Sequence, residues 1–148
     1  MQNGCEDDSK NAMVIELSDG TILTGKSSDI MTASAALVLN AVKHYANIDD
    51  DMLLLSSLVL KPIQQLKKMT DSPGSSSLNM EEVLIALSIC AATNTMAQRA
   101  LSSINKLRFS KAHSTCIISS GDEQMFYKLG IDVTCDPVFA GDNLFYNA

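Results

Sequence analysis

The fold is decided by residues 112–136, AHSTCIISSGDEQMFYKLGIDVTCD. The β-branched run AHSTCIIS at its start predicts a strand, and IDVTCD (131–136) predicts a second one. Between them, Ser120 with Glu123 three residues later has the form of a capping box, which starts a helix, and Gly130 is a typical residue at a helix end. A strand, a helix and a strand in this order predict an α/β unit.

Two shorter β-rich runs lie near the N-terminus, on either side of Ser18-Asp19-Gly20. Residues 13–17 and 21–24 are rich in aliphatic and β-branched side chains, which favour extended backbone. Asp-Gly between such runs predicts a β-hairpin, because glycine readily adopts the positive φ angle of a tight turn. We therefore expect a hairpin at the start of the folded part.

A helix is expected to follow over residues 30–46, IMTASAALVLNAVKHYA, capped by Ser28 or Asp29. This segment is rich in alanine and apolar on most faces, which predicts a central, buried helix. Capping signals predict three further helices: from Ser56 or Ser57 to Lys68 with a kink or a later start at Pro62, from Asn79 to Thr93, and from Thr95 through Leu107.

These elements predict one layered α/β domain over residues 12–148, and an α+β arrangement stays open as the alternative. A chain of 148 residues with 46% hydrophobic residues is long and apolar enough to form its own core. Cys90 and Cys116 fall on apolar faces and are expected in that core. Residues 1–11 are expected to form a flexible tail, and residues 137–148 are expected to lie over the core.

Charge and cysteine content argue against several classes of protein. The net charge of -6 argues against nucleic acid or an anionic membrane as a partner, since both require clustered lysine and arginine. No apolar run reaches the roughly 18 residues of a membrane span, and the polar N-terminus lacks the form of a signal peptide. The four cysteines are far apart, and their even number permits two disulfides, but without an export signal we expect reduced thiols in the cytoplasm. Neither they nor the two histidines have the spacing of a metal site, so no metal is expected.

Three segments of the chain carry a more specific signal than these patterns. They are IELSDGTILTGKSSDIMTASAALVLNAVKHYANIDDD (15–51), KPIQQLKKM (61–69) and EEVLIALSICAATNTMAQRALSSINKLRFSKAHSTCIISSGDEQMFYKLGIDVTCDP (81–137). From about Val14 to Val138 the chain resembles the C-terminal part of a bacterial family known as uncharacterised protein family 0371, or domain of unknown function 1846. Members of that family are much longer, and their N-terminal part carries a glycine-rich, GSGK-like stretch. The resemblance implies a domain of a larger nucleotide- or phosphate-binding protein.

The chain departs from the family pattern in three places. Thr95 follows AATN where the family pattern has Asn-Pro, and a proline of the LLSS region is absent. Phe109-Ser110-Lys111 precedes AHST where the family pattern has Gly-Cys-Glu. The last departure lies beside His113 and weakens the transfer of any role to that residue. The resemblance therefore assigns no catalytic residue.

Gly25, Lys26, Ser27 and Ser28 are candidates for ligand binding because they lead into the N-terminus of the expected helix. Free N–H groups and the helix dipole favour an anion there, and Lys26 adds positive charge. The stretch GTILTGKS (20–27) also satisfies the bare Walker A pattern, but its middle residues have the composition of a strand. The favoured interpretation is a turn and a helix cap, followed by a looser anion site and lastly by a P-loop.

Two further polar pairs are candidates for ligand binding: Asn94-Thr95 at a bend between helices, and His113-Ser114 at the start of a strand. The simpler interpretation of Thr95 is a helix cap, and that of His113 is a half-buried side chain bonded to backbone. Four acidic residues lie in first helical turns, where the helix dipole favours them without a catalytic role: Glu81, Glu82, Asp122 and Glu123.

Two functional hypotheses follow. In the first, the chain is part of a larger enzyme or nucleotide-dependent protein, and the polar regions around Lys26, Asn94 and His113 converge on a cleft shared with the family's N-terminal region. Its ligand is an anionic small molecule. In the second, the chain is a packing or oligomerisation module without a catalytic site, and its Ala-rich helices bury against that region or another copy of the chain. The residues leave open whether the protein is an enzyme, and the cofactor, substrate and reaction stay unknown.

Overall fold

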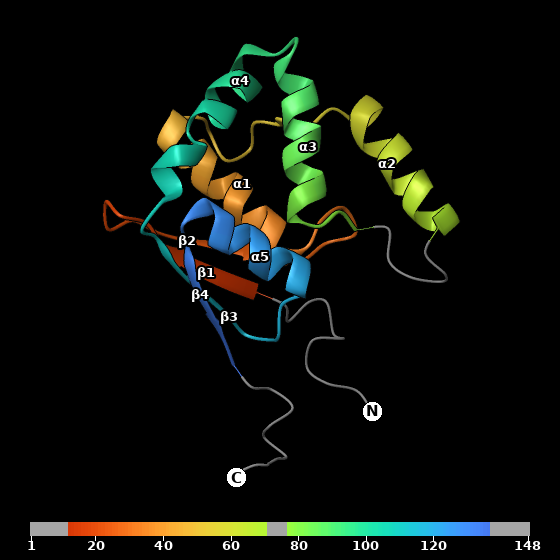
Figure 1. The fold of residues 1–148 in the computed structure, drawn as a ribbon. Coiled ribbons are helices and arrows are strands. Elements are labelled where there is room, and N and C mark those ends of the chain that lie inside the picture. The colour runs from red at the N-terminus through yellow and green to blue at the C-terminus, as the bar shows by residue number, and fades with distance from the viewer. Residues whose placement is uncertain (1–11, 71–76, 137–148) are drawn as a thin grey trace.

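The computed structural model describes residues 12–70 and 77–136, which form a four-stranded sheet with helices packed on one of its faces (Figure 1). The strands are β1 (Ala12–Glu16), β2 (Ile22–Lys26), β3 (Lys111–Ser114) and β4 (Asp132–Cys135). The helices are α1 (Ala33–Ala46), α2 (Ser57–Thr70), α3 (Met80–Ala91), α4 (Thr95–Ser102), the 3-10 helix η3 (Ile104–Leu107) and α5 (Ser120–Leu129). The predicted α/β class, N-terminal hairpin and strand–helix–strand unit are confirmed. The predictions for residues 1–11 and 137–148 concern segments outside the described residues.

The order of the strands places three carboxyl ends at one edge of the sheet. The order is β2-β1-β3-β4, with β1 antiparallel to both of its neighbours and β3 parallel to β4. Strands β2, β3 and β4 therefore run in one direction, and β1 starts where they end. In α/β sheets, ligands bind outside the carboxyl ends of the strands. This edge is the first place to look for a site.

The hairpin turn is fastened to the end of α1. Gly20 has a φ angle of 90°, as the Asp-Gly turn requires, and Asp19 Oδ1 accepts a hydrogen bond from Thr21 N at 2.9 Å. Asp19 Oδ2 lies 2.9 Å from Nε2 of His44, in the last turn of α1. The side chains of Ser18 and Tyr45 hydrogen-bond beside this pair. Two polar contacts thus join the turn to the helix.

The Asp19 contacts predict a stability change in acid. The hydrogen bond to His44, with further bonds from Thr21, lowers the pKa of Asp19 from 3.8 to about 2. A carboxylate whose folded pKa is depressed stabilises the fold above its unfolded pKa, and that contribution is lost as the pH falls through the folded pKa. Urea unfolding from pH 7 to pH 2 is therefore expected to show a shallower loss of stability below about pH 4 in Asp19→Asn than in the unmodified chain. The exposed variant Asp29→Asn should keep the steeper loss, and equal slopes in all three proteins would contradict the assignment.

Helix α1 lies directly on β2 and forms the centre of the core, as predicted. Its buried residues include Leu37, Val38 and Val42. An ideal Cβ built on Gly25 would lie 2.6 Å from the backbone N of Leu37 and 2.9 Å from the carbonyl oxygen of Ala33. Helix and strand approach this closely because Gly25 has no side chain. Gly25 is therefore a packing residue in a strand, and residues 20–27 do not form a P-loop.

Three helices begin at a different capping residue from the expected one. Helix α1 is capped by Thr32 instead of Ser28 or Asp29, α4 by Asn94 instead of Thr95, and α5 by Ser119 instead of Ser120. In each case a neighbouring residue of similar capping strength was available in the sequence. The capping box of Asn79 and Glu82 on α3 is confirmed, with Glu82 N donating to Asn79 Oδ1 and Asn79 N donating to Glu82 Oε1.

The remaining helices differ from expectation in their lengths. A kink or a later start was expected at Pro62, and of these the later start does not occur, because α2 starts at Ser57 and continues through Pro62. Helix α3 ends at Ala91, before the expected Thr93, and the helix expected through Leu107 is divided into α4 and η3. Cys90 lies in the core, as expected. No helix of the described residues is long and apolar enough to cross a membrane.

Two residues just before β3 are in unfavourable environments. Phe109 has a φ angle of 73°, and it is 80% exposed. Ser110 is buried, and its hydroxyl has no hydrogen-bond partner among the described residues. A left-handed conformation costs an ordinary residue about 1–2 kcal/mol.

Phe109→Gly is therefore expected to stabilise the domain by about 1 kcal/mol, since glycine adopts a positive φ angle without strain. Chemical denaturation measures the change. Phe109→Ala removes the same exposed ring but keeps a Cβ, and it should show no such gain. A gain in both variants would assign the effect to the exposed ring instead of the backbone.

Candidate functional site

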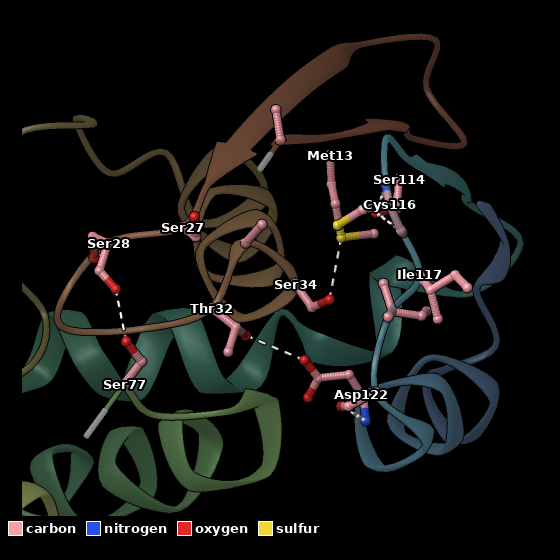
Figure 2. Close-up of a pocket in the computed structure, with 14 residues that line it drawn as sticks. Met13, Ser27, Ser28, Thr32, Ser34, Ser77, Ser114, Cys116, Ile117 and Asp122 are labelled. Carbon is pink, nitrogen blue, oxygen red and sulfur yellow. Dashed lines mark hydrogen bonds between the residues drawn. The ribbon is translucent and has the colours of Figure 1, made fainter. Parts of the chain in front are cut away.

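A cavity of about 290 Å³ lies at the carboxyl edge of the sheet, between the N-termini of α1 and α5 (Figure 2). Ala12, at the start of β1, and Ser114, at the end of β3, form part of its wall. The wall is rich in hydroxyl groups, which come from Ser28, Thr32, Ser34, Ser77, Ser114 and Ser119. The cavity thus occupies the position in which α/β sheets bind ligands.

Asp122 joins the N-termini of three helices at this cavity. It lies in the first turn of α5 and is only 4% exposed. Its Oδ1 accepts a hydrogen bond from the backbone N of Met80, in the first turn of α3, at 2.9 Å, and its Oδ2 accepts one from the hydroxyl of Thr32, the cap of α1, at 3.2 Å. The positive ends of three helix dipoles therefore surround one carboxylate and offset its charge.

The hydroxyl groups of the wall are held in place by contacts within the domain. Ser28 Oγ accepts hydrogen bonds from the N–H groups of Ile30 and Met31, and the Ser77 hydroxyl donates to the carbonyl of Ser28 at 2.7 Å. Figure 2 shows Ser28 and Ser77 facing each other across the rim. These bonds connect the segment after β2 with the segment that leads into α3.

Deeper in the cavity, the Ser34 hydroxyl donates to the Sδ of Met13 at 3.1 Å. The Ser114 hydroxyl donates to the carbonyl of Cys116 at 2.6 Å. Cys116 was expected in the core, but it is half-buried and lines the cavity (Figure 2), because β3 ends at Ser114 and the chain turns toward α5. The cavity is therefore bounded by small polar groups and sulfur atoms.

The electrostatic character of the cavity comes from backbone and not from cationic side chains. Among the described residues no lysine or arginine lines it, and Asp122 is its charged side chain. The first-turn N–H groups of a helix have no acceptor inside the helix, so α1 and α5 present donors to a bound group. The described residues contain no cluster of three or more His, Cys, Asp or Glu side chains that could hold a metal ion.

The structure brings some of the predicted site residues together and separates the others. Ser27, Ser28 and Ser114 line the cavity. Lys26 is the exposed last residue of β2, next to Ser27 in sequence but outside the cavity wall. Gly25 is buried against α1.

Asn94, Thr95 and His113 lie away from the cavity. Asn94 and Thr95 start α4, beyond the far end of α3, whose 12 residues span about 18 Å. The side chain of His113 lies on the opposite face of the sheet from the adjacent Ser114, because side chains alternate along a strand. There its Nδ1 is 2.7 Å from Thr134 Oγ1 and its Nε2 is 2.9 Å from Asp136 Oδ1. Lys26, Asn94 and His113 therefore do not meet in one cleft.

Several cavity residues had no signal as site residues in the sequence analysis. They are Thr32, Ser34, Ser77, Ser119 and Asp122. Each is a small polar residue near the start of a helix, so a capping role accounts for it locally. Thr32 follows β2 and caps α1, and Ser119 follows β3 and caps α5. This shared position after a strand is the signal that could have grouped the two residues.

Comparisons with known proteins agree with the resemblance found in the sequence. A family described as "Domain of unknown function DUF1846, C-terminal" matches residues 2–145. A UPF0371 protein of Clostridium botulinum (strain Langeland / NCTC 10281 / Type F) is 55% identical over 135 residues, which cover 91% of this chain and 27% of the relative. A UPF0371 protein of Clostridioides difficile (strain 630) is 53% identical over 142 residues, covering 96% of this chain and 28% of the relative.

The chain spans about a quarter of the length of these relatives, so the family contains a larger region that precedes this domain. The family match and the high identity to these relatives both extend over nearly all of the chain. The chain belongs to the DUF1846 C-terminal domain family.

Proposed function

We propose that this domain forms one wall of a binding site for a phosphate-bearing or other anionic small molecule, in a larger protein whose N-terminal region completes the site. The observation that carries the proposal is the meeting of the N-termini of α1, α3 and α5 at one hydroxyl-lined cavity. Helix N-termini favour anions through their dipoles and their free N–H groups.

The first turns of α1 and α5 are the proposed contacts for the anionic group. Asp122 already accepts the first N–H of α3, so the donors that stay available belong to the other two helices. The Ser28 hydroxyl, whose oxygen accepts the N–H groups of Ile30 and Met31, would add a donor to the same group. The carboxylate of Asp122 would repel a second anion, so the anion is expected near Ser34, away from Asp122.

The size of the cavity supports a site that is completed by another region. Ligand pockets usually measure about 300–1,000 Å³, and 290 Å³ holds one group of a larger molecule. Ala12, the first described residue, lines the cavity, which is compatible with a site shared with the region that precedes this domain in the relatives. That region would cover the remainder of the ligand.

The state of two thiols supports a reducing compartment for the protein. Within the part of the chain that the structure describes, Cys90 and Cys135 form no disulfide. Free thiols persist in the cytoplasm, where disulfides are rare. We therefore propose a cytoplasmic location.

Thermal unfolding of the purified chain with phosphate, citrate and a set of nucleotides tests the proposal. A ligand at about 100 times its Kd adds about 2.7 kcal/mol, which raises the Tm by several degrees. Ser34→Ala and Ser114→Ala each remove one hydroxyl from the wall and should reduce the shift. Ser88→Ala, on the exposed side of α3, is the matched control and should leave it unchanged. A shift that survives both cavity variants, or no shift with any ligand, would contradict the proposal.

A further inference from the structure

Helix α2 carries an apolar stripe that no other described residue covers. Leu58, Leu66 and Met69 are 85%, 56% and 79% exposed, and Pro62 lies between them. Their spacing of four, four and three residues places all four on one side of an α-helix. Large apolar side chains that gather on one exposed surface mark an interaction site more often than scattered ones do.

The opposite side of α2 already has a partner, so the stripe is not a displaced part of the core. Leu60 and Ile63 pack against a small cluster formed by Ala35, Leu78 and Val83. Lys67 Nζ forms a salt bridge with Glu82 Oε1 of α3 at 2.8 Å. The helix is therefore anchored through one side and presents the stripe on the other.

The charges beside the stripe define the chemistry of its partner. Lys61 and Lys68 are exposed on α2, and residues 57–70 contain no acidic side chain, although the whole chain has a net charge of -6. Lysine at the edge of an apolar stripe favours a partner surface that is apolar in the middle and carboxylate-bearing at its rim.

Helix α2 also borders the rim of the cavity. The Gln64 side chain donates to the carbonyl of Asp29, which follows the cavity residue Ser28. In Figure 1, α2 lies at the outer edge of the helical layer, beside α3. The helix therefore contacts the segment between β2 and α1 that borders the cavity.

We propose that the N-terminal region of the longer family proteins docks on the α2 stripe and thereby covers the cavity. That region makes up most of each relative, since the aligned part is 27–28% of their length, and Ala12, the first described residue of this domain, lies on the cavity wall. The covering of the cavity rests on the proposed function. The docking on α2 does not, and its test uses no ligand.

Hydrogen exchange of α2 in two proteins tests the docking. The first is the 148-residue chain alone, and the second is the full-length Clostridioides difficile relative with its aligned C-terminal part replaced by this chain. Docking is expected to slow exchange in α2 at least about tenfold in the second protein, with α4, which starts away from the cavity, unchanged. Leu58→Lys should remove the protection, while Tyr127→Lys, at an equally exposed site on α5, should not.

The possible results distinguish the N-terminal region of the relatives from a second copy of this chain as the partner of α2. Equal exchange of α2 in both proteins would overturn the proposal. Protection in the isolated chain that rises with its concentration would assign the stripe to a second copy and would also overturn it. If the hybrid does not fold, the unmodified Clostridioides difficile protein provides the same comparison. Its segment aligned with residues 57–70 should exchange more slowly than α2 of this chain, and its segment aligned with α4 should not. A cavity that binds no ligand would leave this result unchanged.

Discussion

Gly25→Ala is expected to destabilise the domain by about 3 kcal/mol, which is at the upper end of overpacking effects. The added Cβ would lie 2.6 Å from Leu37 N, 2.8 Å from Leu37 Cα and 2.9 Å from Ala33 O. All three atoms belong to the backbone of α1, so no side-chain rotation can relieve the contact. The helix must move away from β2, and the buried face of α1 loses its packing.

Gly121→Ala is the matched control for this prediction. Gly121 lies in the first turn of α5, and a Cβ there would meet no atom within 4 Å. Alanine has a higher helix propensity than glycine, so this variant should be neutral or slightly more stable. Urea unfolding of both variants measures the difference. Equal stability of Gly25→Ala and the unmodified chain would show that α1 does not rest on β2 as described.

Asp122→Ala is expected to cost about 3 kcal/mol, because a buried hydrogen-bonding group is left without its partner. The Met80 N–H would lose its acceptor and the Thr32 hydroxyl would lose its contact with α5. The variant also removes a negative charge from three helix N-termini. Chemical denaturation is expected to show the loss, and near-ultraviolet circular dichroism to show looser packing around α5.

Asp122→Asn and Glu123→Gln separate the causes of that loss. Asparagine keeps an oxygen that can accept the Met80 N–H, so Asp122→Asn should cost roughly 1 kcal/mol through the lost charge. Glu123 lies in the same helical turn but is exposed, so Glu123→Gln should change stability by less than about 0.5 kcal/mol. If Asp122→Ala cost no more than Glu123→Gln, the three helices would not be joined through this carboxylate.

Local sequence patterns predicted the elements of this fold well where a single signal decided the outcome. The Asp-Gly turn, the capping box of Asn79 and Glu82, and the left-handed cap at Gly130 all appear as expected. Each depends on residues within one turn, so no distant contact can change it. The order of strands and helices followed from these signals.

Helix starts were less predictable where several capping residues stand in a row. Ser28, Asp29 and Thr32 can each cap a helix. Thr32 caps α1, and its hydroxyl also donates a hydrogen bond to Asp122, 90 residues further along the chain. Asn94 and Ser119 cap their helices through hydrogen bonds to N–H groups two or three residues further on, which Thr95 and Ser120 could have offered equally. For Thr32 a tertiary contact accompanies the choice of cap, and a single sequence does not contain that contact.

The candidate site shows the same limit. Ser27, Ser28 and Ser114 were grouped with Lys26, Asn94 and His113 because all are polar and lie near element boundaries. Strand direction and the alternation of side chains decide which boundaries meet, and these depend on the pairing of β1 with β2 and β3. Asp122 was assigned a local role in its helix, and its bonds to α1 and α3 became visible only in the assembled domain.

Amide chemical shifts of the isotope-labelled chain, titrated with inorganic phosphate and then with the nucleotide that raises its Tm most, test the central claim most directly. The account predicts shifts concentrated in the first turns of α1 and α5, at Ala33, Ser34 and Ser120, with the start of α4 at Asn94 unchanged. Shifts centred on Asn94 or His113, or no shifts with either ligand, would contradict a ligand site at this cavity.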